Sequence, residues 1–97
     1  MTTKTLNGKI ALVTGASRGI GKGIAIALAN AGAHVACIAT KAENANDVVA
    51  TIQTEGGKAV AFGCKVESGS AVTTTFAEVE KQLGPVDILV NNAGISN

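Results

Sequence analysis

The stretch TGASRGIG, residues 14–21, follows directly on the apolar run IALV at 10–13. Residues 15–21 hold three glycines and one arginine. Glycine permits a tight turn out of a strand and lets backbone approach an anion closely. A helix that begins here would present free N–H groups and the positive end of its dipole to a phosphate. The stretch therefore predicts a phosphate-binding turn between a strand and a helix.

The sequence around this stretch alternates between strand-like and helix-like segments. Short apolar runs, typical of strands covered on both faces, lie at 10–14, 34–39, 58–64 and 86–90. Helices are expected between these runs, at 19–31, 42–55 and 68–83. The order β-α-β-α-β-α-β with short connections predicts an α/β fold, a doubly wound parallel sheet that is incomplete after its fourth strand.

Each expected helix has an apolar face for the sheet, and Ser68 is the expected N-cap of the third. The three faces are Ile20, Ile24, Leu28 and Ala31; Val48, Val49 and Ile52; and Val72, Phe76, Val79 and Leu83.

Composition excludes several classes of function. A net charge of +1 and only two aromatic residues, both phenylalanine, argue against binding nucleic acid or an anionic membrane surface. Neither a secretory signal nor a membrane span is apparent, so a cytoplasmic protein is expected. Cys37 and Cys64 lie in apolar segments and are expected to be reduced, buried and inert. His34 lacks ligand partners at metal-binding spacing, so no metal is expected and His34 is expected only to open a strand.

The glycine stretch is also close to a P-loop, which requires G-x-x-x-x-G-K-[ST]. Ala16 stands at the place of the first glycine, and Gly23 follows Lys22 where a hydroxyl residue is needed. Phosphoryl transfer is therefore not expected. The glycines could instead serve only the packing of the helix against the strand, and this alternative stays open.

A second motif, NNAG at 91–94, follows the fourth expected strand. In a doubly wound sheet the fourth strand lies beside the first, and ligands bind in the crevice at their carboxyl ends. We therefore expect Asn91 and Asn92 to face the glycine stretch across this crevice. A simple turn that ends the strand is the alternative for either residue.

The two motifs together resemble the paired signature of the short-chain dehydrogenase/reductase family, T-G-x-x-x-G-x-G and N-N-A-G. The sequences LNGKIALVTGASRGIG at 6–21 and VDILVNNAGIS at 86–96 are similar to those of the 3-oxoacyl-acyl-carrier-protein reductases of that family. The resemblance implies that residues 1–97 form the N-terminal part of a single Rossmann-type NADP-binding domain. It implies cofactor contacts from Gly15, Ser17, Arg18, Gly19, Ile20, Gly21, Thr40, Val66, Asn92, Ala93 and Gly94.

The end of the second strand indicates which nicotinamide cofactor this would be. Members of the family that prefer NAD usually carry a carboxylate there, whereas this chain reads IATK at 38–41. Thr40 can donate a hydrogen bond to the 2′-phosphate of NADP, and Arg18 can supply positive charge. Lys41 could add charge or be a solvated lysine. We therefore predict NADP(H).

The end of the third strand departs from the family. The chain has Lys65 before Val66, where members commonly have aspartate. Val66 can still pack on the adenine, but a contact from residue 65 to the adenine is left open.

The family's catalysis relies on a serine and a tyrosine in the motif Y-x-x-x-K, and this chain contains no tyrosine. We therefore expect the cofactor-binding part of an oxidoreductase, inactive alone. By the resemblance, the full-length form would reduce a small-molecule or acyl-carrier-bound carbonyl, such as a 3-oxoacyl thioester of fatty acid biosynthesis, and form a homo-oligomer. The run ILV at 88–90 would be an exposed apolar edge. The alternative is a stand-alone nucleotide-binding or regulatory module without catalytic activity.

Overall fold

The computed structural model describes residues 5–65 and 69–92, and strands and helices alternate along them in the expected order. The elements are β1 (Ile10–Thr14), α1 (Gly19–Asn30), β2 (His34–Ala39), the 3-10 helix η1 (Ala42–Ala45), α2 (Asn46–Thr54), β3 (Lys58–Gly63), α3 (Gly69–Leu83) and β4 (Ile88–Val90). Ser68, the expected N-cap of α3, lies outside the described residues.

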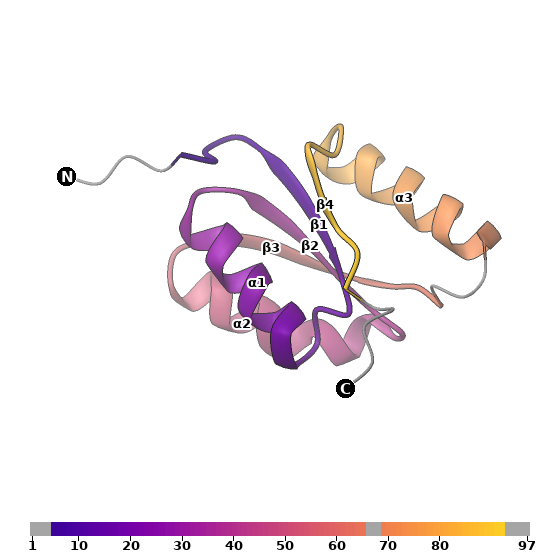
Figure 1. Ribbon diagram of the computed structural model, residues 1–97, viewed down its shortest axis with the longest axis horizontal. Helices are drawn as coiled ribbons and strands as arrows, with labels where there is room; N and C mark the ends of the chain where they lie inside the picture. Colours follow the sequence, from indigo (N-terminus) through magenta and orange to yellow (C-terminus); the bar gives the residue numbers. More distant parts are fainter. Residues whose placement is uncertain (1–4, 66–68, 93–97) are drawn as a thin grey trace.

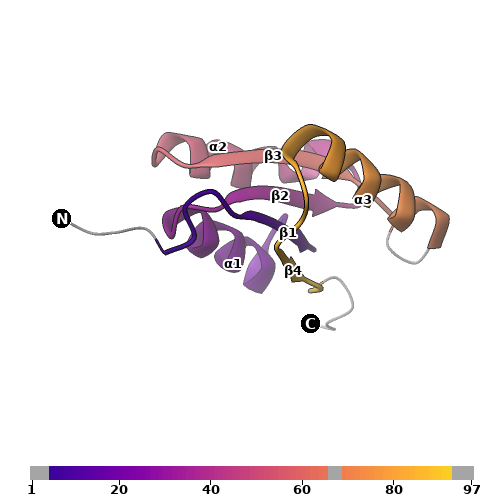
Figure 2. The same cartoon turned by 90° about the horizontal axis from the view of Figure 1, so that it is seen from above.

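The strands form one parallel sheet in the order β3-β2-β1-β4. Helices α1 and α2 lie together on one face, and α3 lies on the other (Figure 1, Figure 2). Because β1 lies between β2 and β4, its carboxyl end is at the point where successive connections leave to opposite sides. The prediction of an incomplete doubly wound α/β sheet is confirmed.

Successive residues of each strand face opposite layers, as the pleat requires. In β1, Ala11 and Val13 pack toward α1 and α2, whereas Leu12 packs toward α3. Cys37 and Cys64 are both buried and unpaired, as expected. Burial raises the pKa of the Cys37 thiol to about 12, which keeps it protonated and unreactive.

Helix α1 does not bury the face expected from its larger residues. Ile20 is 62% exposed, and the fully buried positions are Gly21, Ala25 and Ala29. Residues four apart lie on one face of a helix, and small residues there let the helix axis approach the sheet closely. Ile24 and Leu28 are only partly buried, and they pack at the margin of this contact. The expectation for Ile20 was therefore wrong.

The other two helices differ from expectation in smaller ways. The segment expected as one helix at 42–55 is the short η1 followed by α2, with Val48 and Ile52 buried as predicted. In α3 only Val79 is fully buried, and Val72 is 38% exposed.

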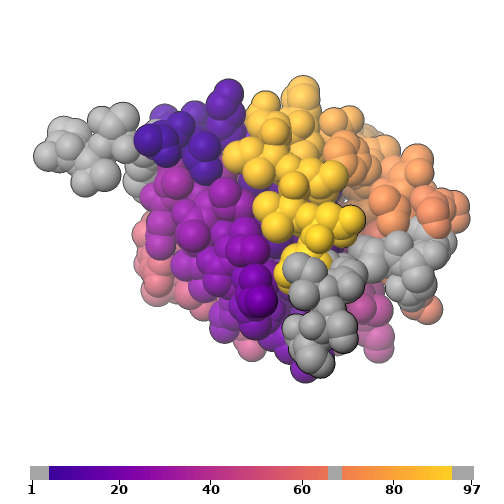
Figure 3. Space-filling view, viewed as in Figure 1, coloured from indigo at the N-terminus to yellow at the C-terminus, as the bar shows by residue number. Residues whose placement is uncertain are grey.

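Strand β4 is shorter than expected because of Asp87. The Asp87 carboxylate accepts the Ile10 N–H at 2.9 Å, and the Asp87 N–H donates to the Ile10 carbonyl at 2.8 Å. At this end of β4, the Asp87 side chain thus takes the place of a backbone acceptor for the Ile10 N–H. Within the described residues β4 pairs only with β1, and Leu89 is 57% exposed, in line with the expected apolar edge. In Figure 3 this last segment, in yellow, lies at the surface beside α3.

Among the described helices, none combines the length and apolarity that crossing a membrane would need.

His34, which opens β2 as predicted, makes stability depend on pH. Burial and its cross-strand partner Lys58 lower the imidazole pKa below 6.5. The unfolded chain therefore binds a proton more readily, so we expect the contribution of His34 to stability to be complete above pH 6.5 and to be lost as the pH drops below it. Urea unfolding between about pH 5 and 8 would measure the slope, and His34→Gln should flatten it. If His34→Gln kept the wild-type slope, the effect would belong to other groups.

Candidate functional site

The connection between β1 and α1 is a tight turn built on two glycines. Gly15 and Gly19 have φ of 63° and 62°, in the left-handed region that favours glycine. Between them Ala16 is fully buried, and its N–H donates to the carbonyl of Ile38 at 3.0 Å. The turn is thus attached to the end of β2, which fixes where the helix starts.

The N-terminus of α1 has the features of an anion site. Arg18, at the N-cap, has extended backbone, and its side chain makes no capping hydrogen bond. The first N–H groups of an α-helix have no acceptor within the helix. The first turn also lacks an acidic residue, and a Cβ added at Gly19 would meet nothing within 4 Å. A phosphate could therefore reach these N–H groups, with the exposed Ile20 beside them.

Gly21 has a different role from Gly19, since it lies at the closest contact of the turn. A Cβ built at Gly21 would overlap the Gly15 carbonyl oxygen and lie 2.6 Å from Nδ2 of Asn92. Helix α1 thus lies directly against the turn and against the end of β4, with no room for a side chain between them.

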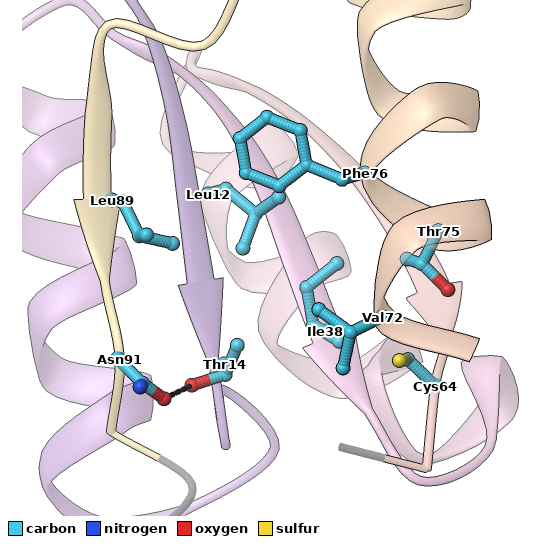
Figure 4. A pocket seen from close by; sticks show the side chains of 9 residues that line it. All are labelled: Leu12, Thr14, Ile38, Cys64, Val72, Thr75, Phe76, Leu89 and Asn91. Carbon is cyan, nitrogen blue, oxygen red and sulfur yellow. Dashed lines mark hydrogen bonds between the residues drawn. The ribbon is translucent and has the colours of Figure 1, made fainter. Parts of the chain in front are cut away.

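The residues after β4 are held to the turn by hydrogen bonds. The Asn92 N–H donates to Oγ1 of Thr14 at 2.8 Å, and Asn92 Nδ2 donates to the Gly15 carbonyl at 3.3 Å. The Thr14 hydroxyl also lies 3.2 Å from Oδ1 of Asn91, as Figure 4 shows. The structure therefore brings Asn91 and Asn92 to the glycine stretch, as expected.

One acceptor at this junction has no hydrogen-bond partner in the part of the chain that the structure describes. This acceptor is the buried Oδ1 of Asn92. Because an unpaired buried acceptor is costly, this oxygen suits a donor supplied from outside the described residues, such as a ribose hydroxyl. Together with the open helix N-terminus, it fits a nucleotide.

A polar pocket of about 550 Å³ lies on one side of the turn. It brings together Ser17, Arg18 and Thr40, all predicted to bind the cofactor. Its remaining lining residues, which the sequence did not point to, are Glu43, Asn44 and Asp47. We call this the Arg18 pocket.

An apolar pocket of about 220 Å³ lies on the other face of the sheet, between β1, β4 and α3. In Figure 4, Leu12, Leu89 and Phe76 converge on it, while Thr14 and Asn91 lie at its polar end. The carboxyl edge of the sheet therefore carries a polar pocket and an apolar pocket, with the glycine turn between them.

Several predicted residues are not placed at the site. Val66, Ala93 and Gly94 lie outside the described residues. Lys41 is exposed and does not line the Arg18 pocket. Within residues 5–65 and 69–92, no group of three or more His, Cys, Asp or Glu is arranged to hold a metal ion.

The comparison with known proteins agrees with this geometry. Residues 9–97 match the family model of the short chain dehydrogenases. The chain belongs to this family. Its members are oxidoreductases that bind a nicotinamide cofactor, so the resemblance seen in the two sequence motifs is confirmed.

The chain is similar to enzymes with different substrates. It is 42% identical over 95 residues to the 2,3-dihydro-2,3-dihydroxybenzoate dehydrogenase of Bacillus subtilis, covering 98% of this chain and 36% of that protein. It is also 42% identical over 92 residues to a 3-oxoacyl-acyl-carrier-protein reductase of Pseudomonas aeruginosa, covering 95% and 37% respectively. The chain thus spans little more than a third of these relatives' length.

A solved structure shares the fold. A metagenomic short-chain oxidoreductase in complex with NADP superposes with a TM-score of 0.88 at 40% identity, covering 93% of this chain and 41% of that one.

Two glycine substitutions test the close contact at the turn. Gly21→Ala should destabilise the protein by roughly 1–3 kcal/mol, because the new methyl group overlaps the Gly15 carbonyl. Gly23→Ala, in the same helix, meets nothing within 4 Å and should stabilise by about 0.5–1 kcal/mol. Urea unfolding of both variants would measure the difference. Equal effects of the two substitutions would contradict the packing described.

The Thr14 hydroxyl can be tested separately. Thr14→Val removes the acceptor of the Asn92 N–H and should lower the free energy of unfolding by about 1–3 kcal/mol. Thr14→Ser keeps the hydroxyl and should recover most of this loss. Thermal or urea unfolding would compare the two variants. If the Val variant were as stable as the Ser variant, the hydrogen bond from Asn92 to the Thr14 hydroxyl would contribute little to stability.

Proposed function

We propose that residues 1–97 bind NADP(H) at the carboxyl edge of the sheet, as the cofactor-binding part of a carbonyl reductase. The observation that carries the proposal is the uncapped N-terminus of α1 next to Arg18 and Thr40, which offers N–H groups, positive charge and a hydroxyl at one place. A similar solved protein that is a complex with NADP supports it.

The described residues suggest a division of roles. The backbone of Gly19, Ile20 and Gly21 would hold the pyrophosphate, and Arg18 and Thr40 would hold the 2′-phosphate. Oδ1 of Asn92 would accept a hydrogen bond from a ribose hydroxyl. We extend the site to Val66, Ala93 and Gly94 by the family motif alone. When bound, the nicotinamide supplies or accepts the hydride.

The proton that accompanies the hydride needs a different group. The chain has no tyrosine, so the family's usual proton donor is not among its 97 residues. We therefore propose that this chain binds the cofactor and does not reduce a carbonyl alone. For the full-length form we propose a cytoplasmic homo-oligomer that acts on a 3-oxoacyl thioester, on the strength of the similarity to the Pseudomonas aeruginosa reductase.

Removal of the Arg18 charge tests the cofactor proposal. Arg18→Gln should weaken NADPH binding at least tenfold and leave NADH binding nearly unchanged, because only NADPH carries the 2′-phosphate. Titration followed by the fluorescence of the reduced nicotinamide would give both dissociation constants.

Lys81→Gln is the matched control, since it removes one positive charge from exposed α3. It should leave both affinities unchanged. If the wild-type protein bound neither NADPH nor NADH, the proposed function would be wrong.

A further inference from the structure

The Arg18 pocket has an unexpected charge balance. Among the described residues that line it, Arg18 is the one cation, whereas Glu43 and Asp47 both carry carboxylates. These six described residues together carry one net negative charge at neutral pH. A pocket that only had to hold a phosphate dianion would not be expected to carry an excess of negative charge.

The positions of the two carboxylates are set by the fold. Glu43 lies in the first turn of η1 and Asp47 in the first turn of α2, where the helix dipole favours negative charge. η1 itself is held firmly. Ala45 is fully buried, and a Cβ added at Gly63 of β3 would come within 2.9 Å of the Ala42 nitrogen. The carboxylates are thus carried on a packed segment that runs past the end of β2.

We propose that Glu43 and Asp47 set the cofactor selectivity of this pocket by opposing the 2′-phosphate, so that the protein accepts NADH as well as NADPH. This inference rests on the proposed function, because it assumes that the adenosine ribose enters the Arg18 pocket. The acidic group that family members preferring NAD carry at the end of the second strand is absent from Ile38–Lys41. In this chain, two acidic residues of the next segment, Glu43 and Asp47, line the pocket that Thr40 also lines.

The two cofactors respond differently to these charges. A phosphate monoester carries a charge of about −1.5 to −2 at pH 7, and a carboxylate several ångströms away repels it. The 2′-hydroxyl of NADH is uncharged and can donate a hydrogen bond to a carboxylate. The carboxylates therefore weaken NADPH binding and do not weaken NADH binding. Arg18 and Thr40 act in the opposite sense on NADPH, and the selectivity is the difference between the two effects.

Isosteric neutral substitutions test this proposal. Glu43→Gln and Asp47→Asn should each tighten NADPH binding by about threefold to tenfold, from Coulomb repulsion screened by water. NADH binding should stay the same or weaken slightly. The gain for NADPH should shrink when the ionic strength rises from about 0.05 to 0.5 M, because salt screens exposed charges.

Glu55→Gln is the matched control, since it removes the same charge at the far end of α2, roughly 12 Å along the helix from Asp47. It should not alter the ratio of the two dissociation constants. Adenosine 2′,5′-bisphosphate and 5′-AMP are second probes, since they differ only in the 2′-phosphate. They should show the same change in ratio as NADPH and NADH.

The outcomes are distinguishable. If the wild-type protein binds neither cofactor, the proposed function fails. If it binds NADPH but Glu43→Gln and Asp47→Asn leave the NADPH-to-NADH ratio unchanged, or shift both affinities equally, the role of the carboxylates is wrong. Melting temperatures show whether Asp47→Asn also weakens α2; in that case Glu43→Gln, with the salt dependence, decides the question.

Discussion

The whole carboxyl edge of the sheet depends on the close approach of α1 to the Gly15 carbonyl, which the lack of a side chain at Gly21 allows. The same carbonyl accepts a hydrogen bond from Asn92, so one oxygen joins the turn, the helix and the end of β4. With the helix held there, its N-terminus follows Arg18 without a side-chain cap, and the space beside Gly19 is open. The backbone part of the proposed anion site is thus a consequence of how the helix packs against the turn.

Much of the fold could be predicted from short apolar runs. The bounds expected for β1 and β2, 10–14 and 34–39, are those observed, because strands buried on both faces end where apolarity ends. β4 is shorter because the Asp87 carboxylate takes a ladder position, which depends on a tertiary contact. The buried face of α1 could not be predicted for a related reason: hydrophobicity favours Ile20, but the distance between helix and sheet favours glycine and alanine.

The candidate site, like the fold, has features that the sequence predicts and features that depend on tertiary contacts. The meeting of Asn92 with the glycine turn follows from the position of β4 beside β1, which the Rossmann-type strand order predicts. Glu43 and Asp47 could not be assigned from the sequence, because their place depends on how η1 packs after β2. An acidic residue in the first turn of a helix is common wherever the helix lies. The residues that line a pocket from a neighbouring connection therefore become visible only in three dimensions.

The contacts of Thr14 also bear on how the molecule assembles. In β1, Thr14 pairs with Ile38 of β2, which is 24 residues away, whereas its hydroxyl bonds the N–H of Asn92, which is 78 residues away. The entropy of loop closure grows with the logarithm of loop length, so the second contact costs about 1 kcal/mol more to form. Pairing of β1 with β2 can therefore precede docking of β4, and the crevice is completed late in folding. A nucleotide that binds the finished crevice would contact both the β1-α1 turn and the end of β4, and would therefore stabilise the docked form over one in which β4 is still detached.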